Sequence, residues 1–177
     1  MLGINAEVEE WFDQYADDVY SFLSYFYGSL DVDDLVQETF LRAMVKMNLY
    51  KRQASPKTWL CSIARNVAKD SLRKRRSRPT VIETSVLFQV PSSEMSPEGA
   101  TQFNETKQSL HAFIRRLQPN YRDVVILRGI LDLSVTETAS VLGWSDAKVR
   151  TVYHRALKSL RRHLTGTFGE EFTDGYL

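Results

Sequence analysis

Residues 134–164 read SVTETASVLGWSDAKVRTVYHRALKSLRRHL, and this stretch predicts two capped helices separated by a short turn. Ser134, followed three residues later by Glu137, forms a capping box that opens a short helix ending near Gly143. Ser145 is placed to cap a second helix, which continues to the end of the stretch. Two helices joined in this way predict a helix-turn-helix motif.

The second of these helices has an apolar face and a basic face. Its apolar residues recur at helical intervals and predict a buried stripe of Val149, Tyr153, Ala156, Leu157, Leu160 and Leu164. The residues outside that stripe are basic or polar: Lys148, Arg150, Thr151, His154, Arg155, Lys158, Arg161 and Arg162. Such a helix fits the major groove, where Arg and Lys donate to guanine and other side chains hold phosphates. The alternative is a basic face that contacts only solvent.

Helical periodicity dominates the rest of the chain as well, and no segment alternates with period two over a useful length. In the N-terminal part, the pattern predicts one helix over 6–27 and a second from an Asp31 cap to about Met47. A third helix is capped by Ser55, has proline at its first position, and runs to about Arg76. The predicted fold class is therefore all-α.

Between the two helical parts, the segment 77–101 contains three prolines and many Ser and Thr residues, which predict a flexible linker. After it, an apolar stripe ended by Pro119 and a helix from Tyr121 to about Leu131 precede the helix-turn-helix. The predicted organisation is two small helical domains with a linker and a tail: 6–76, 77–101, 102–165 and 166–177, in that order.

The net charge of +1 hides an abrupt change between Leu41 and Arg42, inside the second predicted helix. Residues 1–41 hold ten acidic residues and no Lys or Arg. Residues 42–78 hold twelve Lys and Arg residues and a single acid, Asp70. An acidic surface next to a basic, aromatic-containing one is suited to two partners, one of them polyanionic.

Two surface stripes in the N-terminal domain sharpen this prediction. On the second helix, an acidic stripe with one apolar member recurs at i, i+3, i+4 and i+7: Asp34, Gln37, Glu38 and Leu41. It suits a protein partner, and the alternative is a solvated acidic face. On the third helix, a polar stripe offers phosphate donors and base-edge partners: Thr58, Ser62, Arg65, Asn66, Lys69 and Arg73. Trp59 is suited either to stacking on an unpaired base or to the core.

The composition favours a globular protein, with 43% apolar and 25% charged residues. No apolar run approaches the roughly 20 residues that span a bilayer, and the first residues lack the pattern of a signal peptide. A single cysteine, Cys61, excludes an internal disulfide and fits a cytoplasmic location. We find no metal-ligand spacing, carboxylate dyad or phosphate loop in the sequence, so no metal, cofactor or catalytic residue is expected.

Several motifs resemble those of a known family. DDLVQETFL at 33–41, TWL at 58–60 and IARN at 63–66 resemble region 2 of bacterial sigma factors. LQPNYRDVV at 117–125, LG at 142–143 and HRAL at 154–157 resemble region 4. The order and spacing, with a short linker between the regions, resemble the extracytoplasmic-function (ECF) group of the sigma-70 family. The resemblance implies a non-enzymatic alternative sigma factor that recognises −35 and −10 elements and promotes promoter melting.

The resemblance also implies partners and a role for each surface. The partners are core RNA polymerase, through its β′ clamp helices and β flap, promoter DNA, and an anti-sigma factor, with no insertion into a membrane. Residues matched to core-polymerase binding are Asp33, Asp34, Gln37, Glu38 and Leu41. Residues assigned to the −10 element, next to a base-capturing loop at Gln53–Lys57, are Lys57, Trp59, Ser62, Arg65, Asn66, Lys69 and Arg73. Residues assigned to the −35 element are Lys148, Arg150, Thr151, His154, Arg155 and Lys158.

Some positions depart from the family pattern, among them Thr138, which occupies a normally apolar position in the first helix of the helix-turn-helix. Two other functions fit the same surfaces. One is a repressor or activator that binds duplex DNA as a symmetric dimer without polymerase. The other is a protein-interaction adaptor whose main site is the acidic second helix.

Overall fold

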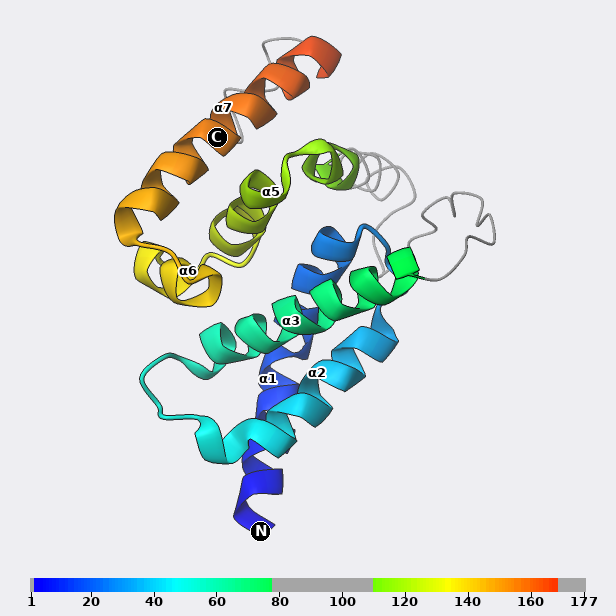
Figure 1. The fold of residues 1–177 in the computed structure, drawn as a ribbon, viewed down its shortest axis with the longest axis vertical. Helices are drawn as coiled ribbons and strands as arrows, with labels where there is room; N and C mark the ends of the chain where they lie inside the picture. The colour runs from blue at the N-terminus through cyan, green and yellow to red at the C-terminus, as the bar shows by residue number, and fades with distance from the viewer. Residues whose placement is uncertain (1, 78–109, 169–177) are drawn as a thin grey trace, which may run out of the picture. The chain divides into compact units, whose positions relative to one another are not determined.

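The computed structural model describes residues 2–77 and 110–168, and these residues fold into helices with no strand. The chain divides into two compact units, Met1–Met95 and Ser96–Leu177, each with its own helices (Figure 1). The all-α fold predicted from the sequence is confirmed. Apart from Ser77, the predicted linker lies outside the described residues, as does the tail beyond residue 168.

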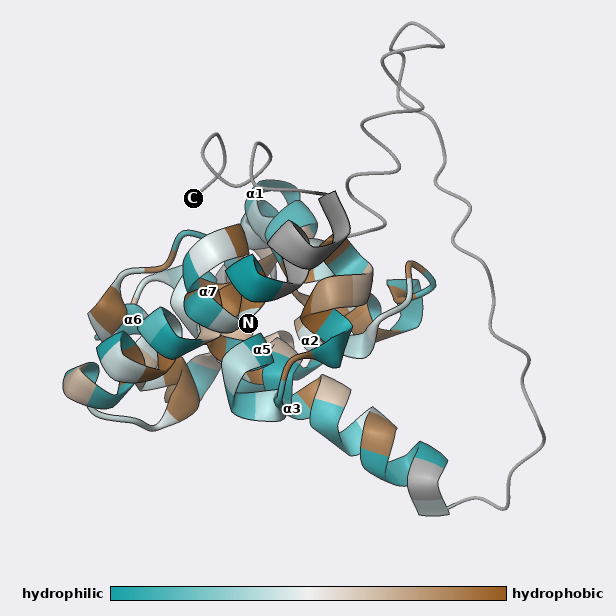
Figure 2. Cartoon of the chain, turned by 90° about the horizontal axis from the view of Figure 1, so that it is seen from above, coloured by the Kyte–Doolittle hydropathy of each residue, from teal (hydrophilic) through white to brown (hydrophobic). Residues whose placement is uncertain are grey.

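The N-terminal unit is a bundle of three helices that all pack on one another: α1 (Leu2–Tyr27), α2 (Asp33–Lys46) and α3 (Pro56–Ser77). A 3-10 turn, η1 (Met47–Leu49), extends α2. The core forms where the apolar stripes meet, and its fully buried members include Phe22, Leu23 and Leu60. In Figure 2, hydrophobic and hydrophilic residues alternate along α3, as expected of a helix with one buried and one exposed face.

The helix ends of this unit confirm one predicted cap and correct another. Ser55 caps α3 as expected, because its Oγ accepts a hydrogen bond from the Thr58 amide at 3.2 Å. Asp31 does not cap α2; the helix begins two residues later, and Val32 is its N-cap without a side-chain bond. Val32 is buried, so its apolar contacts with the core fix the helix start in place of a polar cap. Asp33 and Asp34 then lie in the first turn, where the helix dipole favours negative charge.

The C-terminal unit contains a helix over 110–116, α5 (Pro119–Val125), α6 (Val135–Leu142) and α7 (Asp146–Phe168). The predicted helix from Tyr121 to Leu131 is wrong in two respects. It begins at Pro119, because proline suits the first helical turn, and its α-helical part ends at Val125. It continues as a π-helical turn, η2 (Ile126–Ile130), in which the Leu131 amide donates to the Ile126 carbonyl at 3.0 Å.

The connection from η2 to α6 is fixed by a local arrangement that the sequence pattern did not predict. Asp132 has a left-handed backbone with φ of 53°, which turns the chain so that the Leu133 amide donates to the Leu127 carbonyl at 2.9 Å. Arg128 donates to the Leu133 carbonyl, and its guanidinium carbon lies 5.4 Å from the centre of the Tyr153 ring in α7. Arg128 therefore ties the start of the helix-turn-helix to its second helix.

The helix-turn-helix has the predicted caps. The Ser134 hydroxyl accepts from the Glu137 amide at 3.1 Å, while the Glu137 carboxylate accepts from the Ser134 amide at 2.9 Å. Gly143 ends α6 with φ of 67°, a left-handed conformation that glycine adopts without strain. Ser145 precedes α7 and accepts from the Lys148 amide at 3.3 Å. The relative directions of α6 and α7 therefore depend on the turn at Gly143, which joins two helices whose N-termini are both capped.

Thr138 is fully buried in α6, and its hydroxyl has no hydrogen-bond partner among the described residues. A buried hydroxyl without a partner costs about 1–3 kcal/mol, and valine has nearly the same shape. We expect Thr138→Val to stabilise the C-terminal unit by about 1 kcal/mol, which raises its melting temperature by about 4–8 °C. Scanning calorimetry of the full chain measures this shift.

Thr39 is the matched control. It is also fully buried, but its hydroxyl donates to the Leu35 carbonyl at 2.7 Å. Thr39→Val removes a satisfied hydrogen bond, so we expect no gain in the melting temperature of the N-terminal unit. An equal gain in both variants would show that the added methyl group, rather than loss of the unpartnered hydroxyl, is responsible.

Candidate nucleic-acid and protein interfaces

The outer face of α7 brings the six predicted −35 residues together. All six are exposed on one helix: Lys148, Arg150, Thr151, His154, Arg155 and Lys158. On the opposite side, Val149 and Ala156 are fully buried, which fixes the rotation of the helix on its unit. Burial of this apolar side therefore leaves the basic face of α7 exposed.

The turn before α7 holds the first of these cations in place. The Lys148 ammonium lies 4.3 Å from the centre of the Trp144 ring, a cation–π contact. In the same first turn, Asp146 accepts a hydrogen bond from the Thr136 hydroxyl at 3.1 Å, which links α7 to α6. Trp144 was not predicted as a site residue; its place in the turn, four residues before Lys148, is the signal that could have found it.

On α3, the predicted −10 residues follow one side of the helix. Asn66, Lys69 and Arg73 are exposed, and Ser62 and Arg65 are half-buried. The opposite side carries Leu60, Ile63 and Val67, which are buried, and Leu72 nearer the end of the helix is half-buried. The exposed part of this face consists of amide and cationic side chains, which are suited to phosphates and base edges.

Lys57, also assigned to the −10 element, is engaged within the protein. Its ammonium pairs with the Asp18 carboxylate of α1 at 2.9 Å, and both side chains are partly buried. This ion pair joins the start of α3 to α1. Because an ammonium group has three N–H donors, a phosphate that contacts Lys57 would either share this group with Asp18 or displace Asp18.

Trp59 lies in an aromatic cluster and is half-buried. Its ring centre is 4.9 Å from that of Tyr50 and 5.9 Å from that of Trp11, which is itself 5% exposed. The cluster supports the loop before α3, which the Tyr50 hydroxyl closes by donating to the Ala54 carbonyl at 2.6 Å. Trp59 is therefore compatible with both predicted roles: part of its side chain packs in the cluster, and part is accessible for stacking on a base.

The same loop is attached to α1 by an ion pair. Arg52 has a left-handed backbone with φ of 56°, and its guanidinium donates to both Glu7 carboxylate oxygens, at 2.8 and 2.9 Å. The attachment fixes one side of the loop that the sequence assigned to base capture. Sequence spacing gave no sign of it, since the two residues are 45 positions apart.

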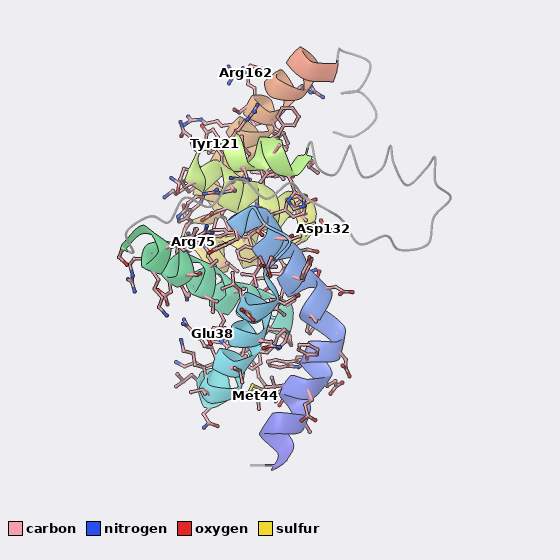
Figure 3. All side chains as sticks on the ribbon, turned by 90° about the vertical axis from the view of Figure 1, so that its right-hand side faces the viewer. Glu38, Met44, Arg75, Tyr121, Asp132 and Arg162 are labelled. Atoms are coloured by element: carbon pink, nitrogen blue, oxygen red, sulfur yellow. The ribbon has the colours of Figure 1, made fainter. Side chains whose placement is uncertain are left out.

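The predicted polymerase stripe lies on the outer face of α2. Asp33, Asp34, Gln37 and Leu41 are exposed, and Glu38, labelled in Figure 3, is half-buried. The stripe also has an apolar continuation that was not predicted from the sequence. Val45 is 82% exposed and Leu49 is 72% exposed, and they follow Leu41, itself 57% exposed, at intervals of four residues. The spacing from Leu41 is the sequence signal that could have found them.

Arg42 joins α2 to α3. Its Nε donates to Glu38 at 2.7 Å and its Nη1 donates to Asp70 at 3.0 Å. The hydrogen bond from Arg42 holds the pKa of the Asp70 carboxyl below its usual value, and the Glu38 and Asp70 carboxylates raise the pKa of Arg42. Asp70 also accepts from Arg73 at 3.3 Å. The only acid of the basic stretch is therefore a partner of two arginines.

Across 2–77 and 110–168, no group of three or more His, Cys, Asp or Glu side chains is arranged to hold a metal ion. Within the same ranges, no helix combines the length and apolarity needed to cross a membrane. Neither finding adds a candidate site to the charged faces of α2, α3 and α7.

Comparison with known proteins gives matches to both units. Residues 11–78 match the family described as Sigma-70 region 2, and residues 107–160 match Sigma-70, region 4. The chain is 34% identical over 157 residues to the ECF RNA polymerase sigma factor SigX of Bacillus subtilis (strain 168), covering 86% of this chain and 81% of SigX. It is 29% identical over 155 residues to SigM of the same organism, covering 87% of this chain and 93% of SigM.

A solved structure has the same fold. The sigma factor RpoE from Bartonella quintana, determined in complex with the anti-sigma factor NepR, matches with a TM-score of 0.71 at 21% identity. The match covers 90% of this chain and 97% of that chain.

The all-helical fold, the helix-turn-helix and the two regional matches define a factor for transcription initiation. The chain belongs to the sigma-70 family of RNA polymerase sigma factors, in its extracytoplasmic-function group. It is an alternative sigma factor, a DNA-binding protein that recognises promoters together with core RNA polymerase.

Proposed function

We propose that each of the three charged faces has one task in initiation. The α2 stripe binds core polymerase, the α3 face reads the −10 element, and the α7 face reads the −35 element. The observation that carries this proposal is the opposite charge of the outer faces of α2 and α3 within one three-helix bundle. An acidic face in the same bundle as a basic one suits a protein that connects polymerase to DNA.

Docking on polymerase rests on charge and on apolar contact. Asp34 and Glu38 supply negative charge that steers and orients a basic partner surface. Leu41, Val45 and Leu49 supply exposed apolar area, which is the part of an interface that stabilises the complex by leaving water. The partner that fits this face is a helical surface with basic residues over the start of α2 and apolar residues over its end.

Reading of the −10 element rests on the α3 face and on Trp59. Asn66, Lys69 and Arg73 contact the strand, while Trp59 offers a partly exposed ring on which an unpaired base stacks. Stacking on the ring offsets part of the few kcal/mol that unpairing costs. Strand opening therefore draws its energy from binding, and we propose that the protein itself has no catalytic activity.

Regulation and location follow from the same assignment. Because RpoE is held by the anti-sigma factor NepR in its solved complex, we propose that an anti-sigma factor also binds this chain. The protein would act in the cytoplasm, where core polymerase and promoter DNA are found.

Run-off transcription with purified core polymerase tests the proposal. The template is a promoter found by sequencing DNA that co-precipitates with the full chain. We expect initiation that depends on both the chain and the promoter. Binding to a palindromic site without polymerase would support a repressor or activator instead, and binding to polymerase without initiation would support an adaptor.

Trp59→Phe tests whether this ring stacks on DNA. Phenylalanine keeps an aromatic side chain in the cluster but offers a smaller stacking surface. We expect binding of the polymerase complex to a forked promoter fragment with unpaired −10 bases to weaken by about 1 kcal/mol. The melting temperature should change little. Fluorescence anisotropy of the labelled fragment measures the affinity.

Trp11→Phe is the matched control, because Trp11 belongs to the same cluster but is buried. It should lower the melting temperature more than Trp59→Phe and change DNA affinity less. If both variants lose affinity only in proportion to their loss of stability, Trp59 serves the core alone.

A further inference from the structure

Four charged side chains form a continuous chain from the polymerase face to the DNA face. Glu38 accepts from Arg42 at 2.7 Å, Arg42 donates to Asp70 at 3.0 Å, and Asp70 accepts from Arg73 at 3.3 Å. Glu38 lies in the α2 stripe and Arg73 lies on the α3 face. The middle members, Arg42 and Asp70, belong to neither surface, and each has two partners of opposite charge.

We propose that Arg42 and Asp70 are positioning residues that couple polymerase binding to −10 binding, because they share partners with Glu38 and Arg73. The proposal rests on the functions assigned above to the α2 and α3 faces. In the free protein, Arg42 divides its hydrogen bonds between two carboxylates, and Asp70 accepts from two arginines.

Polymerase binding changes this division. A cationic group of the polymerase that approaches Glu38 competes with Arg42 for the Glu38 carboxylate. Arg42 then interacts more fully with Asp70. Asp70, satisfied by Arg42, holds Arg73 less strongly, and Arg73 becomes available to a DNA phosphate. By thermodynamic linkage, DNA bound at Arg73 strengthens polymerase binding at Glu38 by the same factor.

The size of the coupling is limited by exposure. The side chains of Glu38, Arg42 and Asp70 are 45%, 30% and 37% exposed, and that of Arg73 is 81% exposed. Ion pairs that are partly open to water contribute little individually, and shared partners transmit only part of that. We therefore expect each substitution to change an affinity about two- to fivefold.

Two single variants should have opposite effects. In Asp70→Asn, Arg42 turns fully to Glu38 and Arg73 is released, so affinity for core polymerase falls and affinity for DNA rises. In Arg42→Gln, Glu38 is released and Asp70 turns fully to Arg73, so affinity for core polymerase rises and affinity for DNA falls. A general folding defect would lower both affinities in both variants.

The experiment measures two dissociation constants with the full chain. The first is for purified core polymerase. The second is for binding of a forked promoter fragment by the saturated sigma–polymerase complex. Asp13→Asn, which changes the same charge at an exposed position of α1, is the control for net charge and should change neither constant by as much as twofold.

The double variant Arg42→Gln/Asp70→Asn separates coupling from simple charge effects. Without Arg42, Asp70→Asn should no longer weaken polymerase binding. Without Asp70, Arg42→Gln should no longer weaken DNA binding. Additive effects in the double variant, or two single variants that change both affinities in the same direction, would overturn the proposal.

Glu38→Gln and Arg73→Ala distinguish failure of the coupling from failure of the proposed function. If each weakens binding to its own partner while the opposite effects are missing, only the coupling is wrong. If neither weakens binding to its own partner, the assignment of the two faces is wrong, and the coupling fails with it.

Discussion

Replacing Asp34 and Glu38 together by lysine weakens binding to core polymerase about 100-fold or more. Both residues lie on the outer face of α2 and precede the exposed apolar residues of the same stripe. Each substitution removes an attraction and puts a like charge against a basic partner, which costs several kcal/mol across an interface. The loss should be smaller at high salt, because screening weakens the repulsion of the partly exposed charges.

Folding of the double variant has to be checked, because both residues also act within the bundle. Asp34 lies in the first turn of α2, where a positive charge loses about 0.3–1 kcal/mol of interaction with the helix dipole. Glu38→Lys also removes a carboxylate partner of Arg42. These effects should lower the melting temperature by a few degrees and leave the helical circular dichroism spectrum unchanged.

Asp13→Lys/Asp17→Lys is the matched control. These two acids are exposed on α1, have the same spacing of four residues, and give the same change of net charge. Co-purification with core polymerase and a titration by surface plasmon resonance measure both pairs. Equal weakening in the two pairs would attribute the effect to net charge, and unchanged binding of Asp34→Lys/Glu38→Lys would remove polymerase docking from α2.

The parts of the fold that the sequence predicts well are those determined by local interactions. The capping box of Ser134 and Glu137 and the end of α6 at Gly143 need only neighbouring residues, and both were predicted. The Asp31 cap was wrong because Val32 packs into the core, and burial of an apolar side chain outweighs a single cap bond. The π-helical turn after Val125 was missed because its extra residue does not alter the apolar pattern enough to be read.

The same distinction applies to the candidate sites. Helical periodicity places the α2, α3 and α7 residues on exposed faces, since it depends only on spacing along one helix. It does not predict that Lys57 pairs with Asp18, or that Arg42 pairs with Asp70, since these contacts depend on how helices pack. Such ion pairs determine which charged side chains are already paired within the protein and which are available to a binding partner. Periodicity locates an exposed face but does not show which of its charges are available.

Arg150 is the residue of the α7 face from which we expect the largest loss of −35 recognition. It is exposed one position after the buried Val149, in the second turn of the recognition helix, where side chains of a helix-turn-helix contact base edges. An arginine that contacts guanine through two hydrogen bonds contributes about 1–3 kcal/mol of discrimination. Arg150→Ala should therefore reduce transcription from a −35-dependent promoter about tenfold or more.

The comparison of two promoters and two variants shows what kind of contact Arg150 makes. A promoter whose −35 element is replaced should lose little further activity with Arg150→Ala, because the contact is already absent. Arg150→Lys keeps the charge but not the planar two-bond geometry, so a base contact predicts a loss close to that of alanine. A phosphate contact predicts instead that lysine restores activity and that alanine lowers the salt dependence of DNA binding by about one phosphate.

Arg116→Ala, at an exposed arginine of the same unit, controls for the loss of one positive charge. Equal losses at both promoters, with a lowered melting temperature, would mean that Arg150 supports the fold of its unit and does not read the −35 element.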